Sequence, residues 1–242
     1  MCYYVNIKLK KGEFMNFYKN NEIVLDVWGD FACFTNPLSK VERVSFDCIT
    51  PSAARGILNA IYSKPIEFYY QITKIEIMNP IKKINIRKNE FKEKTNAKKL
   101  TPIYNITKKG EKGLTQRNNF YLKDVYYRIY AKIIKQPTFN GTLQQLYDQF
   151  EKRLLKGKCF YQPCLGTREC FCYFSEKNEN KQPLNINMDL GIITYDVFDI
   201  RNNIPLDTSK NINTFKPSYF KAKIINGVLE VPEYESDAVL KL

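Results

Sequence analysis

The order of strand-forming and helix-forming segments limits the possible folds of this chain more than any other feature. β-branched and aromatic residues, which favour strands, fill several short stretches. Strands are predicted at residues 22–34, 66–78, 120–134 and 170–174. Helix-forming segments at 50–62 and 142–156 separate the first strand from the second and the third from the fourth. This β-α-β-β-α-β order predicts an α+β protein whose N-terminal domain is ferredoxin-like (RRM-like), a split βαβ arrangement.

Both predicted helices have recognisable ends. Thr50 can accept hydrogen bonds from the first amides of one helix, and Pro51 suits its first turn. Lys64-Pro65 ends that helix, because the residue before a proline avoids the helical conformation. Gly157 follows the second helix at a position where glycine commonly stops one.

Three parts of the chain follow from these segments. We expect an N-terminal arm, then the ferredoxin-like domain, then a smaller antiparallel β-sheet region with strands at 191–198 and 219–231. The predicted bounds are 1–21 for the arm, 22–165 for the ferredoxin-like domain with a basic loop at 82–117, and 166–242 for the β-rich region.

The charge of the chain points to a polyanionic partner. The formal net charge is +13, which favours either nucleic acid or an anionic membrane surface. Between Lys74 and Arg117 stand 13 Lys or Arg residues and 4 acidic residues, so +9 of the +13 lies in this stretch. A basic composition throughout the chain would not concentrate the charge in this way.

Several chemistries are excluded or unsupported. The chain has no histidine, which excludes Ser-His and Cys-His nucleophile systems. Gly-rich phosphate loops and paired carboxylate motifs are absent from the sequence, and we expect no cofactor. No apolar run approaches the roughly 20 residues that a bilayer span needs, and residues 1–21 contain charges that a signal peptide core would lack. We therefore expect a cytoplasmic protein that does not contact membranes.

Four cysteines close together raise the possibility of a zinc site. Cys159, Cys164, Cys170 and Cys172 fall within one short segment. No two neighbouring cysteines have the two intervening residues of structural zinc knuckles, and no histidine can complete a mixed site. The spacing favours free thiols packed as small apolar groups, and we expect no metal.

Basic residues with amides and aromatic residues nearby suit RNA. Cations bind phosphates, aromatic rings stack on bases, and amides hydrogen bond to base edges. Each such residue could equally lie on a solvated surface with no contact. The candidates are Lys40, Arg43, Arg55, Arg87, Lys88, Asn89, Gln116, Arg117 and Asn118.

An ordered series of segments resembles the CRISPR-associated Cas-five family, in particular its d-type member of subtype I-C systems, within the RAMP superfamily. The segments are 27–34 (VWGDFACF), 40–46 (KVERVSF), 50–56 (TPSAARG), 61–65 (IYSKP), 86–90 (IRKNE), 116–118 (QRN), 121–125 (YLKDV) and 162–169 (QPCLGTRE). The resemblance spans roughly residues 22–235.

The resemblance implies a fold and a function. It implies a ferredoxin-like N-terminal domain followed by a β-sheet region, and a role in CRISPR immunity. A family member binds the repeat hairpin of the guide-RNA precursor and cuts at its base without metal, using the RNA 2′-hydroxyl. It then stays on the 5′ handle within the Cascade complex, so the implied partners are guide RNA, the backbone and large subunits, and target DNA. Arg153 and Arg168 complete the set of candidate RNA-binding residues.

The residues that would carry the cleavage match the family only in part. Tyr62 matches the tyrosine that follows the first helix in the family. The family's Lys-His pair is replaced by Leu146-Tyr147 in this chain. The candidate catalytic residues are therefore Tyr62, Tyr147 and Lys152, with Arg153 or Lys156 also able to stabilise a phosphorane.

Three alternatives stay open at this point. The protein is an endoribonuclease, a handle-binding structural subunit without activity, or a basic protein of another class that binds DNA or a membrane surface. The absent Lys-His pair separates the first two, because an ordinary tyrosine is a poorer base at neutral pH than a histidine. Tyr62 has an alternative role as well, filling the helix–sheet core with its hydroxyl bonded to the backbone.

Overall fold

A computed structural model describes residues 21–39, 41–91, 114–201 and 217–241. These residues form two α-helices and nine β-strands, and every pair of neighbouring strands is antiparallel. The predicted α+β class is therefore confirmed. The elements are β1 (Ile23–Ala32), α1 (Pro51–Ile61), β2 (Phe68–Ile77), β3 (Lys82–Phe91), β4 (Leu114–Lys135), α2 (Leu143–Leu155), β5 (Tyr173–Glu176), β6 (Met188–Asp196), β7 (Ser218–Ile225), β8 (Val228–Glu230) and β9 (Val239–Lys241).

The ends of the helices follow the sequence signals. The Thr50 side chain accepts a hydrogen bond from the amide of Ala53 at the start of α1. Thr142 and Gln145 exchange hydrogen bonds at the start of α2, which satisfies amides that the helix itself leaves without partners. Gly157 has a φ of +59° just after α2, in the left-handed region that favours glycine.

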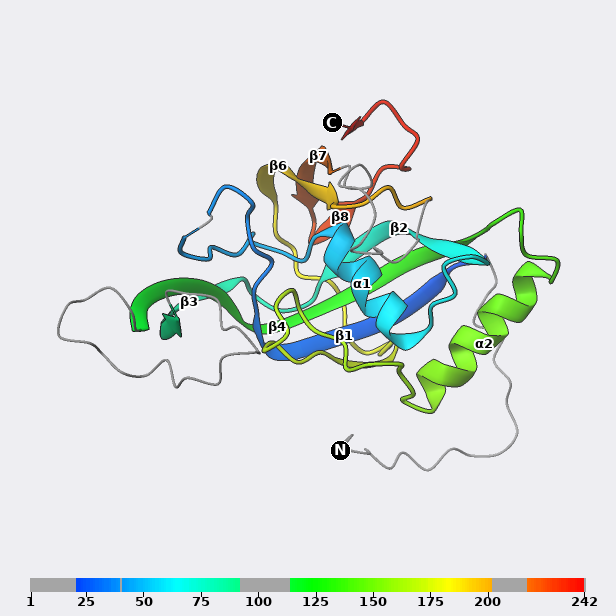
Figure 1. Ribbon diagram of the computed structural model, residues 1–242, viewed down its shortest axis with the longest axis horizontal. Helices are drawn as coiled ribbons and strands as arrows, with labels where there is room; N and C mark the ends of the chain where they lie inside the picture. The colour runs from blue at the N-terminus through cyan, green and yellow to red at the C-terminus, as the bar shows by residue number, and fades with distance from the viewer. Residues whose placement is uncertain (1–20, 40, 92–113, 202–216, 242) are drawn as a thin grey trace, which may run out of the picture.

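One sheet runs through the whole protein in the order β5-β1-β4-β2-β8-β7-β6. β4 is 22 residues long, and its second half pairs with β1 and β2 while its first half pairs with β3. In Figure 1, β3 and this first half of β4 extend away from the helices as a two-stranded arm. The predicted basic loop therefore contains strands at 82–91 and 114–117, and its remainder, 92–113, lies outside the described residues.

The C-terminal strands continue the same sheet, because β8 pairs with β2. The segment predicted as one strand at 219–231 is two strands, β7 and β8, joined at Asn226-Gly227. Both of these residues have positive φ, 50° and 76°, as a tight hairpin turn requires. A side chain at Gly227 would also meet the Leu184 carbonyl oxygen at 1.9 Å, so only glycine fits there.

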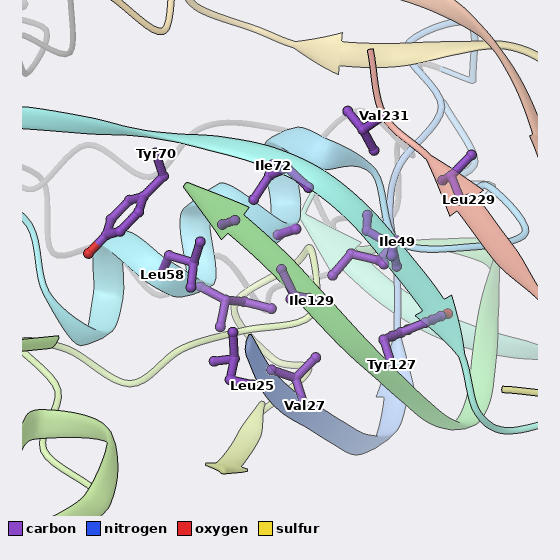
Figure 2. Close-up of a cluster of buried hydrophobic side chains, with 14 of the residues drawn as sticks. Leu25, Val27, Ile49, Leu58, Tyr70, Ile72, Tyr127, Ile129, Leu229 and Val231 are labelled. Carbon is purple, nitrogen blue, oxygen red and sulfur yellow. The ribbon is translucent and has the colours of Figure 1, made fainter. Parts of the chain in front are cut away.

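The core lies between α1 and the sheet. Figure 2 shows Leu25 and Val27 of β1 and Ile129 of β4 close to Leu58 of α1. All four side chains are fully buried, and each contributes on the order of 1.5–3 kcal/mol by its removal from water. Because this packing fixes α1 on the sheet, it also fixes Tyr62, the residue that directly follows the helix.

Among the described residues, no helix is long and apolar enough to cross a membrane.

Candidate functional site

A cluster of charges lies where the arm meets the rest of the sheet. The Glu169 carboxylate accepts a hydrogen bond from Lys88 Nζ at 2.8 Å and lies 3.7 Å from Arg43. The buried Tyr121, on β4, donates its hydroxyl to the same carboxylate at 2.9 Å. Two of the predicted RNA-binding cations, Arg43 and Lys88, are therefore brought together, and one carboxylate is held between them.

The Glu169 carboxylate is charged throughout the physiological range. Partial burial alone would raise its pKa, but hydrogen bonds from Lys88, from its own backbone amide and from Tyr121 lower the pKa to about 2. Its negative charge offsets part of the positive charge of Lys88 and Arg43. The cluster consequently attracts phosphate less strongly than its cations alone would.

The arm carries predicted RNA-binding residues on both of its faces. Lys88 pairs across the strands with Arg117, and Arg87 pairs with Asn118. Neighbouring residues on a strand point to opposite faces, so Lys88 and Arg117 share one face while Arg87 and Asn89 point to the other. Arg117 donates to the Val41 carbonyl at 2.8 Å, and Arg87 is exposed.

Arg55 lies in an ion pair with the C-terminal part of the sheet. Its side chain is buried, and its guanidinium binds both carboxylate oxygens of Asp196, at 2.7 and 2.8 Å. This ion pair joins α1 to the end of β6. The contact of Arg55 with RNA stays a prediction, and the structure shows this side chain directed toward the C-terminal strands.

A second group of side chains surrounds the C-terminal end of α1. Arg153, on α2, donates from Nε to the Ile61 carbonyl at 2.6 Å. Its guanidinium lies 4.1 Å from the ring centroid of Phe160, and the Phe160 amide donates to the Ala60 carbonyl at 2.7 Å. A cation at this place is favoured because the carbonyl end of a helix carries a partial negative charge.

Tyr62 directly follows α1 in this group. It is 4% exposed and its ring packs on Phe68, with the ring centroids 5.2 Å apart. Burial raises the pKa of its hydroxyl, although Lys64 and Arg153 lower it in part. The ring fills the helix–sheet core, in agreement with the alternative role, but the hydroxyl makes no hydrogen bond with the described residues. At neutral pH it is protonated, so it can donate a hydrogen bond or a proton.

The other two predicted catalytic residues lie on α2 and differ from each other. The Tyr147 side chain is 1% exposed, and its hydroxyl accepts from the Ile133 amide at 3.0 Å and donates to the Asn21 carbonyl. Burial also raises the pKa of Tyr147. Lys152 is exposed, and no ion pair involves it within the described part of the chain. Lys152 can therefore meet a phosphate, whereas Tyr147 connects α2 to β4.

Of the two remaining predicted RNA-binding residues, Arg168 and Lys40, the structure describes only Arg168. Arg168 is exposed in the turn between Cys164 and Phe171, which form an antiparallel bridge. Lys40 lies outside the described residues.

Of the four clustered cysteines, Cys170 and Cys172 are buried and Cys159 and Cys164 are half-buried. Burial raises the pKa of Cys172 and Cys164, as expected for packed thiols. Within the four described ranges, no three His, Cys, Asp or Glu residues converge as metal ligands.

Three residues of these groups, Tyr121, Glu169 and Phe160, are absent from the candidates predicted from the sequence. Glu169 lies in a segment that resembles the family, but the sequence does not show that cations surround it. Phe160 follows the break at Gly157 and is 57% exposed. The signal that could identify Phe160 is an aromatic residue outside the predicted helix, in a segment rich in lysine.

Known proteins of one family are similar to this chain over most of its length. A family model described as CRISPR-associated protein (Cas_Cas5), of the Cas5d type, matches residues 22–232. A protein of Mannheimia succiniciproducens named CRISPR pre-crRNA endoribonuclease Cas5d is 37% identical over 238 residues, which covers 90% of this chain and 98% of the relative. A protein of Thermus thermophilus with the same name is 35% identical over 228 residues, covering 89% of this chain and 93% of the relative.

Two solved structures share the fold. One is titled as the crystal structure of a CRISPR-associated protein, with a TM-score of 0.60 and 23% identity, over 90% of this chain and 95% of the other. The other is a functionally uncharacterized protein from Streptococcus mutans, with a TM-score of 0.59 and 23% identity. The match covers 90% of this chain and 96% of the other. The match to the family model covers far more than half of the sequence, and both curated relatives exceed 30% identity. The chain therefore belongs to the Cas5d-type family of CRISPR-associated proteins.

Proposed function

We propose that this protein binds the repeat hairpin of a precursor CRISPR RNA, cuts it without a metal ion, and keeps the 5′ handle as a subunit of a Cascade complex in the cytoplasm. The observation that carries the proposal is the identity of 37% and 35%, over about 90% of the chain, with relatives named as pre-crRNA endoribonucleases. The partners are then guide RNA, the backbone and large subunits, and target DNA within the complex.

The strand order supports a ferredoxin-like interpretation of the first part of the protein. The first four strands of the sheet are ordered β5-β1-β4-β2, and along the chain they alternate with the helices as β1-α1-β2, then β4-α2-β5. This order supports a split βαβ arrangement. Its fourth strand, β5, begins at Tyr173, so a ferredoxin-like domain would reach past the predicted boundary at residue 165.

The group at the end of α1 suits cleavage by the RNA itself. The 2′-oxygen attacks the adjacent phosphorus and the bond to the 5′-oxygen breaks, which leaves a cyclic phosphate and a 5′-hydroxyl. The 5′-oxygen needs a proton, which the protonated Tyr62 hydroxyl can donate. Arg153 and Lys152 can stabilise the negative charge that develops on the phosphoryl oxygens.

The group offers no comparable base for the 2′-hydroxyl. Without a histidine, that proton passes to hydroxide or to a weak base, and the loss of a placed base typically costs about 10²–10⁴-fold in rate. We therefore expect slow cleavage. The geometry also favours a second candidate, a handle-binding subunit without activity, because Tyr147 matches the position of the family's histidine and its hydroxyl accepts from the Ile133 amide and donates to the Asn21 carbonyl.

Incubation of the purified protein with its repeat RNA in EDTA tests the proposal. We expect slow cutting at one position that leaves a cyclic phosphate, and no cutting when the nucleotide before the cut lacks its 2′-hydroxyl. Tyr62→Phe should stop the reaction, while Tyr219→Phe, which removes a tyrosine hydroxyl from β7, should not change it.

Two other results of this experiment would change the conclusion. Tight binding of the repeat RNA with no cutting by the wild-type protein establishes the second candidate. Equal cutting by the wild-type protein and Tyr62→Phe contradicts the role of Tyr62.

A further inference from the structure

Three aromatic rings form a column across the sheet, on the side away from α1. Trp28 of β1 pairs with Tyr126 of β4 on one side and with Tyr173 of β5 on the other. The Trp28 and Tyr126 ring centroids are 5.6 Å apart with an interplanar angle of 12°. Trp28 and Tyr173 are 6.1 Å apart at 26°. The rings therefore stack along the direction in which the strands hydrogen bond.

The two ends of the column are different. At the Tyr126 end, Lys181 Nζ lies 3.5 Å from the ring centroid and covers the outer ring face. The Tyr126 hydroxyl also donates to the buried Asp26 at 3.0 Å, which fixes the ring. At the other end, Tyr173 lies on β5, the last strand of the sheet order on this side, and is 49% exposed. One end is closed by a cation and the other is open.

Several exposed aromatic residues lie close to Tyr173 along the chain. Six aromatic side chains of the described residues are strongly exposed: Phe31, Phe120, Phe160, Tyr161, Phe171 and Tyr173. Four of these six lie between residues 160 and 173, which is far from an even spread over the chain. Cross-strand aromatic pairs stabilise sheets, but that role does not require an exposed ring at the edge. Exposed rings near bound cations are typical of surfaces that stack single-stranded bases.

The column is joined to the charged cluster by a short piece of chain. Glu169, which binds Lys88 and Arg43, is four residues before Tyr173, so their Cα atoms are at most ~14 Å apart. The segment between them contains the exposed Phe171, and Arg168 precedes it. An RNA strand whose phosphates lie on the cluster can therefore bring a base to Tyr173.

We propose that the open face of Tyr173 is a stacking site for an unpaired RNA base, which extends the column Tyr126–Trp28–Tyr173 by one ring. The inference rests on the proposed RNA-binding function and goes beyond it by naming a contact to a base outside the cleavage group. Because the rings are already aligned and held by the strands, little ordering is needed when the base binds.

The charges beside the column favour stacking over phosphate contacts. The exposed residues Asp30 and Asp124 stand two positions away from Trp28 and Tyr126 on β1 and β4. Asp124 pairs with Lys82 at 3.6 Å, so the Asp30 carboxylate is the one that repels a nearby phosphate, and an approach from the side of β5 avoids it. Binding at Tyr173 should therefore depend on salt less strongly than binding at the arm.

The single tryptophan of the chain makes a direct test possible. Fluorescence of Trp28 is recorded while an oligoriboadenylate of about eight nucleotides is added, a length within the ~4–16 nucleotides of known single-strand sites. Tyr173→Leu keeps an apolar side chain on the strand but has no ring, and Tyr173→Phe keeps the ring. An abasic ribose-phosphate chain of the same length is the ligand control. Circular dichroism checks that both variants are folded.

We expect the adenylate to quench Trp28 in the wild-type protein and in Tyr173→Phe. Tyr173→Leu should weaken binding about tenfold, within the range of about 5- to 150-fold for the loss of one stacked base. Equal affinity in Tyr173→Leu and wild type, or equal affinity for the abasic chain, overturns the inference.

A gel shift with the repeat hairpin separates this inference from the proposed function. If the wild-type protein binds neither RNA the proposed function fails, and if it binds only the hairpin then this inference alone fails.

Discussion

The arm and the end of α1 both carry cations, but these cations have different partners. Four cations of the arm form ion pairs with carboxylates. They are Lys82 with Asp124, Lys83 with Asp47, Lys88 with Glu169, and Arg117 with Glu90. At the end of α1, Arg153 instead binds a carbonyl oxygen and an aromatic ring. Across the described ranges, no acidic side chain forms an ion pair with Arg153.

The difference shows that the net charge of a sequence segment does not give the number of cations that are free of acidic partners in the folded protein. The stretch 74–117 holds +9 of the net charge, yet Asp47, Asp124 and Glu169 come from outside it and offset three of its cations. At the end of α1, Lys64 pairs with Glu67 at 2.9 Å, whereas Arg153 has no acidic partner among the described residues. We therefore expect the arm to position RNA and the end of α1 to act on the phosphate that is cut.

The largest effect is expected on the free energy of unfolding, at the buried ion pair between Arg55 and Asp196. Arg55→Met leaves the 1%-exposed Asp196 without its partner, which should lower the free energy of unfolding by about 3–5 kcal/mol. Urea denaturation measures this. Arg168→Met, which removes an exposed cation, should stay within about 0.5 kcal/mol of wild type. A small effect of Arg55→Met would contradict a structural role for this pair.

The next effect concerns the rate of cleavage. Arg153→Met should lower kcat about 10²–10³-fold, the usual loss when a group that stabilises transition-state charge is removed. KM should change much less, and single-turnover kinetics separates the two. Lys221→Met removes the same charge from an exposed position on β7 and should leave kcat unchanged. If KM rose and kcat stayed constant, Arg153 would hold RNA without acting on the scissile phosphate.

At the arm, we expect a substitution that strengthens RNA binding, whereas the two preceding substitutions lower stability or activity. Glu169→Gln removes the charge that offsets Lys88 and Arg43, so repeat RNA should bind about threefold more tightly at low salt. The slope of log affinity against log salt should become steeper by about 0.7 for each additional phosphate that the two cations neutralise. Filter binding at several salt concentrations measures both. Weaker binding by Glu169→Gln would mean that the carboxylate is needed to orient the two cations.

The smallest effect is a dependence of stability on pH. The folded pKa of Glu169 is about 2, below its ordinary value of 4.5, so its contribution is present above pH 4.5 and is lost as the pH falls toward 2. Because this carboxylate is partly exposed and screened by solvent, the contribution should be less than about 1 kcal/mol. The difference in unfolding free energy between wild type and Glu169→Gln should narrow over that range. A constant difference would show that the charge of Glu169 does not stabilise the fold.

Most of the main elements can be predicted because their signals are local. Thr50 and Pro51 mark the start of α1, and the apolar runs of β1, β2 and β4 follow from burial against that helix. β3 is harder to predict, because it carries charged residues on both faces, although Ile84 and Ile86 pack against the edge of the core. The turn at Asn226-Gly227 interrupts a continuous run of strand-forming residues, which is why one strand is predicted where two are present.

The candidate site can be predicted only in part. Tyr62 and Arg153 follow from the family resemblance, and the structure places both at the end of α1. The burial of Arg55 cannot be predicted, because its partner Asp196 is 141 residues away along the chain. The role of Glu169 depends in the same way on Lys88, which is 81 residues away. Ion pairs over such separations depend on the whole fold, which composition and local spacing do not contain.

The length of β4 sets a fixed distance between the two regions. Arg117 lies near its start and Ile133, which binds Tyr147 of α2, lies near its end. Sixteen steps along one strand, at roughly 3.3 Å each, give a path of roughly 50 Å measured along the strand. This approaches the length of about 15 stacked nucleotides at ~3.4 Å. A continuous strand visible across Figure 1 can thus act as a ruler, so that an RNA held at the arm presents one particular phosphate to the distant helices.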